Sequence, residues 1–449
     1  MFFRNLDQVD SLDGMMSYNP EFLLIDILII IHFFFIWYLS YKKSGWMIDL
    51  WHYTIFMSIF LSGFIQYPFI SSPLNVFALG SRWTNVASFA ESVLVLNILG
   101  YICMYAGRYL YDLFAGKIAF KLNSLEKIIA NNAQSGFVIR VMALLTLAFI
   151  GVFIILQIRM GILFNPRAFF LENNTLRPLF NGLSGLLHIL TTYFILRVFD
   201  YKKKIDITVC VLLITSNSFM GTRSAIIGAL LTCLIWYIYK RRGRINLIKF
   251  SGIVSGIFIA LLVVTTLRGD MSNDGIPLSS IISFFLFYGN SFSDLRDGAF
   301  FFSCYDGDFL YGKTYLAALM SFVPRFLSDF REMWSLGVVT ATAAGFNPIE
   351  HPGLRISTFG EMFLNFGYFG VMLLGVMYGW FLRKYDCLLK YAMDRGILLT
   401  STYSKIFIFT AIISLFTSSA GFFGFYVFLI MNFIIHLIRL IIRYLNSPL

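Results

Sequence analysis

The sequence predicts an all-α polytopic integral membrane protein with about 11 transmembrane helices. Three observations carry this prediction: 58% of the 449 residues are hydrophobic, only 13% are charged, and the mean hydropathy is +0.76. A soluble globular chain is about one quarter charged, so the composition excludes that class. Backbone groups in lipid must form their hydrogen bonds internally, which makes the predicted spans helical.

Eleven apolar segments approach the roughly 20 residues that a helix needs to cross a bilayer. We predict spans at 22–40, 50–70, 88–105, 137–156, 180–199, 205–220, 224–239, 247–267, 356–382, 406–418 and 422–442. We expect the whole chain, 1–449, to form a single transmembrane domain. We expect no cleavable signal peptide, because the first apolar run starts late and has no basic segment before it.

The basic residues predict the orientation. If Lys42 and Lys43 face the cytoplasm, the spans place 23 of the 35 basic residues there, 13 lysines and 10 arginines. This asymmetry follows the positive-inside rule. Of the 12 residues on the outer face, only Lys313 is a lysine. A face that keeps arginine favours bidentate binding of phosphate or carboxylate, unless single arginines merely pair with loop carboxylates.

The net charge of +11 belongs mostly to the cytoplasmic side, where basic runs next to spans bind anionic membrane lipids. We therefore expect no nucleic-acid partner. The five cysteines show no disulfide or metal-binding spacing. We predict that the protein has no metal site and needs no cofactor.

Two outer segments differ from ordinary connections. An Arg-rich loop at 159–179 carries Arg159, Arg167 and Arg177. A long outer, extracytoplasmic loop at 268–355 has six basic and nine acidic residues, and its apolar runs are too short to cross a bilayer. We expect short amphipathic or re-entrant helices in this second loop, which is long enough to act as a lid.

Two positions near the outer face stand out in the predicted spans. Arg223 lies at the tip of the hairpin between the sixth and seventh spans, where a guanidinium is costly unless it meets an anion or water. In the ninth span, Glu361, Asn365 and Tyr368 fall at i, i+4 and i+7 and are expected to share one helix face. Gly375 and Gly379 should let another helix approach closely.

The chain resembles the Wzy-type family, the O-antigen and oligosaccharide repeat-unit polymerases of bacterial surface polysaccharide assembly. The resemblance covers roughly residues 140–385. Its strongest parts are FLYGKTYLAALMSFVPRFL at 309–327 and STFGEMFLNFGYFGV at 357–371, and its weaker parts are MGTRSAIIG at 220–228, RGD at 268–270 and NPRAFF at 165–170. Members often have an even number of spans, whereas the hydropathy of this chain gives eleven.

The resemblance implies a polymerase of the bacterial plasma (inner) membrane, active on its outer, periplasmic face. Such an enzyme transfers a glycan from polyprenyl pyrophosphate to a new lipid-linked repeat unit. Its expected partners are the polyprenyl-pyrophosphate-linked oligosaccharide, membrane lipids and a chain-length regulator protein. O-antigen lipopolysaccharide and capsule are both open as products.

The residues suit a metal-independent transfer. Arginines supply charge-assisted hydrogen bonds to the departing lipid diphosphate. An acceptor hydroxyl needs a base, for which Glu361 is the first candidate and His351 the second. The candidates for binding pyrophosphate and glycan are Arg223, Arg268, Arg355, Arg325 and Arg167.

Three other classes compete with a polymerase. An O-antigen ligase shares the chemistry and differs in the acceptor. A lipid-linked oligosaccharide flippase or transporter should show internal repeats and charges near the bilayer midplane, and the sequence shows neither. A membrane acyltransferase should have a buried catalytic histidine, and the histidines form no convincing constellation for one: His32, His52, His188 and His436.

Overall fold

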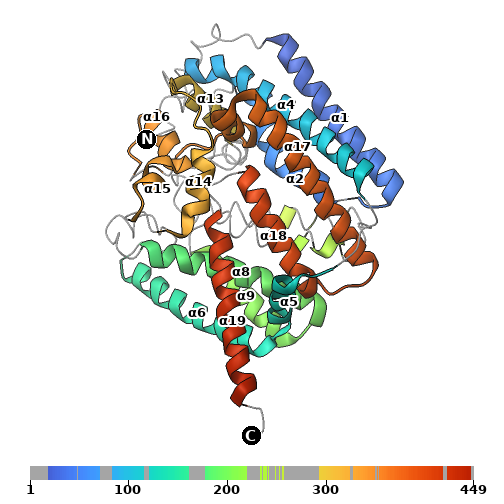
Figure 1. The fold of residues 1–449 in the computed structure, drawn as a ribbon, viewed down its shortest axis with the longest axis vertical. Helices are drawn as coiled ribbons and strands as arrows, with labels where there is room; N and C mark the ends of the chain where they lie inside the picture. The colour runs from blue at the N-terminus through green and yellow to red at the C-terminus, as the bar shows by residue number, and fades with distance from the viewer. Residues whose placement is uncertain are drawn as a thin grey trace.

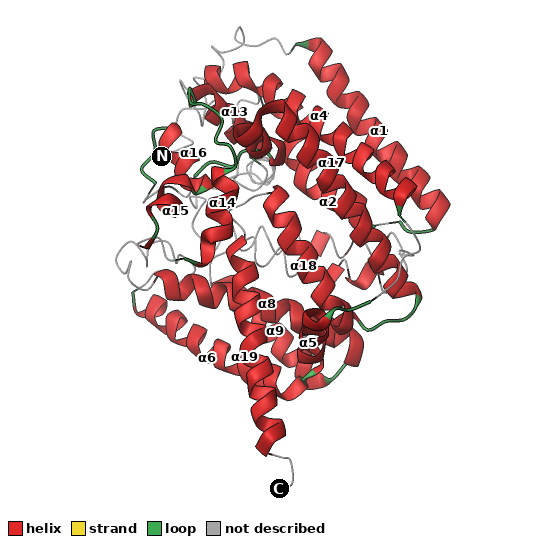
Figure 2. Ribbon diagram, in the orientation of Figure 1, coloured by secondary structure: helices red, strands yellow, loops and turns green. Residues whose placement is uncertain are grey.

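The computed structural model describes residues 19–47, 49–70, 83–115, 121–160, 177–219, 233–234, 236–239, 241, 248, 252, 255–256, 293–323, 327–348, 351, 353–417 and 422–445. Every regular element in these ranges is a helix (Figures 1 and 2). This confirms the predicted all-α class.

The long helices are α1 (Pro20–Ser44), α4 (Trp83–Phe114), α6 (Gly136–Arg159), α8 (Arg177–Tyr201), α9 (Lys204–Phe219), α17 (Thr358–Asp394), α18 (Leu399–Thr417) and α19 (Phe423–Leu445). The shorter ones are α2 (Leu50–Ile55), the π-helix η2 (Phe56–Phe64), the 3₁₀-helix η3 (Tyr67–Phe69), α5 (Ser124–Gln134), α13 (Asp294–Cys304), α14 (Lys313–Leu319), the 3₁₀-helix η7 (Met320–Phe322), α15 (Asp329–Trp334) and α16 (Leu336–Ala343). The short helices α13–α16, within residues 294–343, gather on one side of the molecule, at the upper left of Figure 1. We call them the cap.

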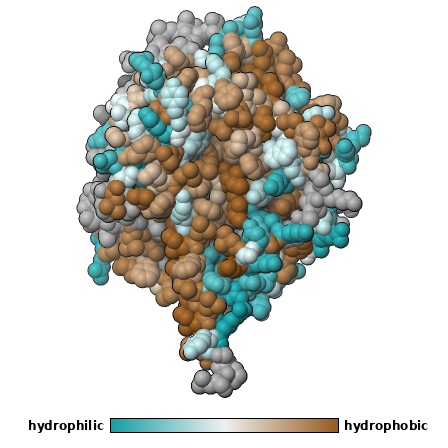
Figure 3. All heavy atoms as spheres, viewed as in Figure 1, coloured by the Kyte–Doolittle hydropathy of each residue, from teal (hydrophilic) through white to brown (hydrophobic). Residues whose placement is uncertain are grey.

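Seven of the described helices are long and apolar enough to cross a membrane. They are Pro20–Ser44, Phe89–Phe114, Gly136–Arg159, Leu179–Tyr201, Thr358–Asp394, Leu399–Thr417 and Phe423–Leu445. In Figure 3 apolar atoms dominate the middle of the visible face, while hydrophilic atoms gather over the cap and toward the lower right. Apolar helices exposed in this way are typical of a multi-pass membrane protein.

The structure does not confirm the predicted count of eleven. The segment predicted to span at 50–70 is divided into α2, η2 and η3. Helix α9 has 16 residues, fewer than a full crossing needs. Most of the predicted spans at 224–239 and 247–267 lies outside the described residues.

Helices α4 and α17 form the central pair and run side by side in Figure 1. Their backbones approach at glycines: a Cβ atom added at Gly107 would collide with the Val376 carbonyl, and one at Gly379 with the Met104 carbonyl. A Cβ at Gly375 would lie 3.0 Å from that of Cys103. The predicted close approach at Gly375 and Gly379 is confirmed, and it holds α17 rigidly beneath the cap.

The opposite end of the bundle holds most of the described basic residues, and we call it the lysine-rich end. It contains Lys42, Lys43, Lys127, Lys202, Lys203, Lys204, Lys390, Lys405, Arg439 and Arg443. Its side chains join separate helices: Lys405 pairs with Glu126 of α5, and Arg439 donates to Asn132 of α5. These two contacts hold α18 and α19 against α5.

Candidate active site

Glu361 lies where the cap meets the first turn of α17. Helix α17 begins after Ser357, whose hydroxyl accepts a hydrogen bond from the Gly360 N–H at 3.0 Å. A carboxylate in the first helical turn is favoured by the helix dipole. Glu361 is only 1% exposed, and its Oε1 accepts a hydrogen bond from the Thr314 hydroxyl of α14 at 2.9 Å. The first candidate base therefore sits in a fixed, buried position.

Asn365 completes this network. Its Nδ2 donates to Thr314 Oγ1 at 2.8 Å and to the Glu361 carbonyl at 2.9 Å, while its Oδ1 accepts from the Gly312 N–H at 3.0 Å. The Thr314 hydroxyl thus both donates and accepts. Thr314, Glu361 and Asn365 are all buried. A polar group left without a hydrogen bond in such a place would cost about 1–3 kcal/mol, so the network is needed to keep these side chains there. The network fixes the cap segment 310–314 to α17.

A break in α17 creates room for this segment. Gly367 has φ 63° and ψ −158°, a conformation essentially restricted to glycine. Carbonyls just before a helix end lack helical partners. Here the carbonyls of Leu364 and Asn365 accept hydrogen bonds from the N–H groups of Leu310 and Tyr311, at 3.0 and 2.9 Å. Backbone N–H groups of the cap thus bind the carbonyls that the break in α17 leaves without helical partners.

The break corrects one prediction. Glu361 and Asn365 share a buried face, as expected, but Tyr368 is 56% exposed. The turn at Gly367 rotates the helix, so the i+7 relation does not hold across it. Tyr368 instead packs its ring against Phe363, with centroids 5.0 Å apart.

Asp294 is a second carboxyl group near the start of α17. It begins α13, and the middle of α13 lies against the chain just before α17, since a Cβ at Gly298 would be 3.7 Å from the Ile356 Cα. Loss of water around the carboxyl raises the pKa of Asp294 to about 7, while the positive charge of Arg355 and a hydrogen bond with Ser62 oppose the rise. A carboxyl with a pKa near 7 suits general acid or base chemistry. Sequence reasoning missed Asp294, and a serine and aspartate opening a helix is the signal that marks it.

Arg355, one of the predicted phosphate ligands, is exposed. It lies close enough to Asp294 for its positive charge to oppose the rise in the pKa of that carboxyl. The described basic residues of the cap each have a partner. Arg296 pairs with Asp297 at 2.9 Å, the Lys313 Nζ lies 4.0 Å from the centre of the Trp334 ring, and Arg331 donates to the Val323 carbonyl.

His351, the second candidate base, is held in a local turn. Its ring stacks on Phe346, with centroids 4.4 Å apart and an angle of 18°. Its Nδ1 accepts a hydrogen bond from the Gly353 N–H at 3.2 Å. One ring nitrogen therefore serves to shape the turn that leads into α17.

The remaining predicted ligands lie outside the described residues: Arg167, Arg223, Arg268 and Arg325. It stays a prediction that these arginines share a cleft with Glu361. It also stays a prediction that residues 159–179 form an Arg-rich outer loop. Within the described ranges no group of three or more His, Cys, Asp or Glu side chains could hold a metal ion.

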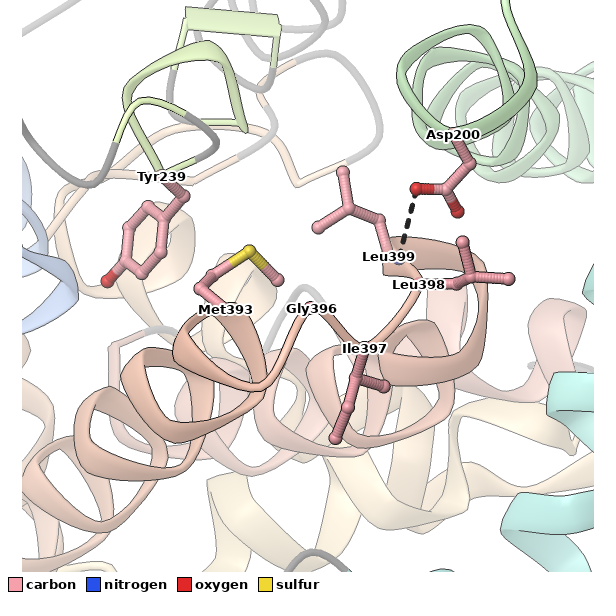
Figure 4. Close-up of a pocket in the computed structure, with 7 residues that line it drawn as sticks. All are labelled: Asp200, Tyr239, Met393, Gly396, Ile397, Leu398 and Leu399. Atoms are coloured by element: carbon pink, nitrogen blue, oxygen red, sulfur yellow. Dashed lines mark hydrogen bonds between the residues drawn. The ribbon is translucent and has the colours of Figure 1, made fainter.

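A cavity of about 300 Å³ lies at the opposite end of α17 from Glu361 (Figure 4). Its lining comes from the turn between α17 and α18 and from the facing helices: Asp200, Tyr239, Met393, Gly396, Ile397, Leu398 and Leu399. The Asp200 carboxylate accepts from the N–H groups of Leu399 and Thr400, at 3.2 and 2.9 Å. It caps α18, so its role is structural.

Fold and site together define a multi-pass helical membrane protein with a buried carboxylate, Glu361, beneath a helical cap. Comparison of the chain with models of known protein families gives no match, and comparisons with curated proteins and with solved structures give none either.

Proposed function

We propose that the protein is a Wzy-type polymerase, a membrane glycosyltransferase that joins polyprenyl-pyrophosphate-linked oligosaccharide repeat units on the outer face of the bacterial plasma membrane. The observation that supports this most directly is the buried Glu361, held by Thr314 and Asn365 at the junction of α17 and the cap. This network lies inside the two segments that most resemble the family.

The proposed reaction is a displacement at an anomeric carbon. The acceptor hydroxyl oxygen forms the new glycosidic bond, the bond to the pyrophosphate breaks, and the lipid diphosphate leaves with the electron pair. The hydroxyl proton passes to a carboxylate, for which Glu361 is the first candidate. Arginine side chains, Arg355 among those described, stabilise the diphosphate without a metal ion.

The burial of Glu361 adds a requirement to this mechanism. At 1% exposure, the carboxylate is covered by α14, whose Thr314 occupies Oε1. An acceptor hydroxyl reaches it only when α14 moves away from α17. The cap would therefore open to admit substrate and close to exclude water, which is a common role of such lids.

The proposal includes eleven spans, with the cap on the outer face and the lysine-rich end in the cytoplasm. Two pairs of oppositely charged residues support it, because the members of each pair are predicted on the same face: Lys405 with Glu126 on one side, and Asp294 near Arg355 on the other. The positive-inside rule assigns the lysine-rich end to the cytoplasm.

The test is synthesis by the purified, lipid-reconstituted protein from polyprenyl-pyrophosphate repeat units, with a chelator present. We expect a ladder of polymers, and Glu361→Gln should slow it at least about 100-fold, as expected for removal of a general base. Glu332→Gln is the matched control, because Glu332 is an exposed carboxylate of the cap. Transfer only to a lipid A core acceptor would indicate a ligase instead. Strict metal dependence would refute the mechanism.

A further inference from the structure

Arg108 of α4 is partly buried, and it differs from five other partly or fully buried cations at the lysine-rich end. Each of those has a carboxylate oxygen within 3.3 Å: Arg140, Arg197, Arg383, Lys390 and Lys405. Within the described part of the chain, Arg108 forms neither an ion pair nor a hydrogen bond. Its guanidinium carbon lies 5.2 Å from the centre of the Trp51 ring and 5.9 Å from that of Tyr105.

Three buried donor atoms gather around this guanidinium. They are Arg108 Nη1, Trp51 Nε1 and the Tyr105 hydroxyl, and none has a hydrogen-bond partner among the described residues. The Trp51 N–H and the Tyr101 hydroxyl both approach the Tyr105 hydroxyl, and neither approach has the geometry of a normal hydrogen bond. Trp51 is fully buried, and its ring meets that of Tyr105 edge-on, 5.9 Å away.

Unpaired buried donors are costly, and a charged one is the most costly of the three. The Tyr105 hydroxyl can accept as well as donate, but the arginine and indole N–H groups only donate, and the positive charge of the arginine favours an anionic acceptor. The two aromatic rings also stabilise the guanidinium by cation–π interaction. Arginine offers the fork geometry that suits phosphate oxygens.

The position along α4 fits such a ligand. Arg108 stands six residues before Phe114, the last residue of α4, which is about 9 Å along the helix axis. A side chain at this depth can reach the headgroup region of a membrane. Tyr109 and Leu113 beside it are exposed, at 64% and 57%, as expected for a lipid-facing surface.

We propose that Arg108, Trp51 and Tyr105 form a binding site for a phosphate group at the lysine-rich end. An anionic lipid headgroup and a soluble phosphoryl compound share this chemistry. The site lies on the bundle face formed by α2 and α4, at the opposite end of α4 from the cap. It is therefore independent of the proposed transferase reaction.

The test is thermal unfolding of the full-length protein in a neutral detergent, titrated with dioctanoyl phosphatidylglycerol, inorganic phosphate or zwitterionic dioctanoyl phosphatidylcholine. We expect phosphatidylglycerol, phosphate or both to stabilise the wild type more than phosphatidylcholine. Arg108→Gln should weaken the response at least about tenfold in apparent Kd, which corresponds to about 1.4 kcal/mol. The control is Arg395→Gln, because Arg395 is an exposed arginine at the same end and also lies over a tyrosine ring, 5.4 Å from Tyr391.

The pattern of responses identifies the source. Stabilisation by phosphatidylglycerol alone assigns the site to a lipid headgroup, and stabilisation by phosphate alone assigns it to a soluble ligand. An equal response to all three compounds, or equal responses of the Arg108 and Arg395 variants, would overturn the proposal. If Arg108→Gln does not fold, Trp51→Phe and Tyr105→Phe decide, since each removes one donor and leaves an aromatic ring at the position; wild-type responses in both would also overturn the proposal.

Discussion

The two ends of the bundle use buried carboxylates in different ways. At the lysine-rich end, Asp206 pairs with two arginines, and Asp386 pairs with Lys390 at 2.9 Å and Arg383 at 3.2 Å. Beneath the cap, Glu361 Oε1 accepts from a neutral hydroxyl, and Asp294 faces an exposed arginine. A carboxylate between two cations joins helices through ion pairs, whereas loss of water around a carboxyl with fewer charged partners raises its pKa, as at Asp294.

Asp49 shows the first arrangement most clearly. Burial by itself raises the pKa of this carboxyl, but hydrogen bonds from His52 and the charge of Lys390 outweigh it and hold the pKa well below its usual range. Asp49 also caps α2 by accepting from the His52 N–H at 2.9 Å. This carboxylate keeps one charge state at any physiological pH, so it acts as a structural group.

The largest expected effect is the loss of Lys390. Its Nζ lies 3.1 Å from Asp49 and 2.9 Å from Asp386, so Lys390→Met leaves two buried carboxylates without that cation. We expect a loss of about 3–5 kcal/mol in the free energy of unfolding, measured by denaturant titration in detergent. Lys384→Met is the control, because Lys384 is exposed on the same helix. Normal stability with reduced turnover would break the comparison, since it would place chemistry at the lysine-rich end.

Replacement of Gly367 tests how the cap is attached. Alanine at φ 63° and ψ −158° is strained, and its Cβ would approach the Phe309 ring to 3.0 Å. We expect Gly367→Ala to cost about 1–3 kcal/mol and to increase proteolysis between 305 and 314. Gly424→Ala is the control, because a Cβ there meets no atom within 4 Å. An unchanged digestion pattern would show that the break does not hold the cap.

Hydropathy and charge predicted the long helices well, because span length and apolar faces are local properties of the sequence. The predicted spans at 22–40 and 137–156 lie inside α1 and α6. The break at Gly367 could not be predicted in this way. The neighbouring Gly370 offers the same freedom, and the choice depends on segment 309–314, more than 50 residues earlier.

The site was predictable only in part for the same reason. Glu361 and Asn365 were found by helical spacing within one segment. Asp294 depends on packing among three distant segments, represented by Ser62, α13 and Arg355. No local pattern reports such an environment. Nor does any pattern reveal that Trp51 and Arg108 meet, since they belong to different helices.

A smaller effect is expected at Thr314, which links the cap to both Glu361 and Asn365. Thr314→Val keeps the side-chain shape and removes one donor and one acceptor from a fully buried position. We expect a loss of about 1–3 kcal/mol of stability. If the cap must open for catalysis, the variant should also lower the substrate KM or raise kcat. The control is Thr410→Val, because the Thr410 hydroxyl is exposed and bonds only within its own helix. Equal stability of both variants would mean that the buried network contributes little.

The sharpest test of the comparison is a pH dependence at Asp294. Its pKa is about 7 in the folded protein and about 3.8 when unfolded. Between these values the folded state keeps a proton that the unfolded state has lost, so the wild type should lose stability as pH rises from about 4 to 7 and change little above that. Asp294→Asn removes this dependence, and the stability difference between variant and wild type should grow in favour of the variant over the same interval. Asp49→Asn should show no such trend there, because the Asp49 carboxyl stays ionised in the folded protein. Parallel curves for wild type and Asp294→Asn, measured by thermal unfolding at several pH values, would mean that the Asp294 carboxyl is as fixed in charge as that of Asp49.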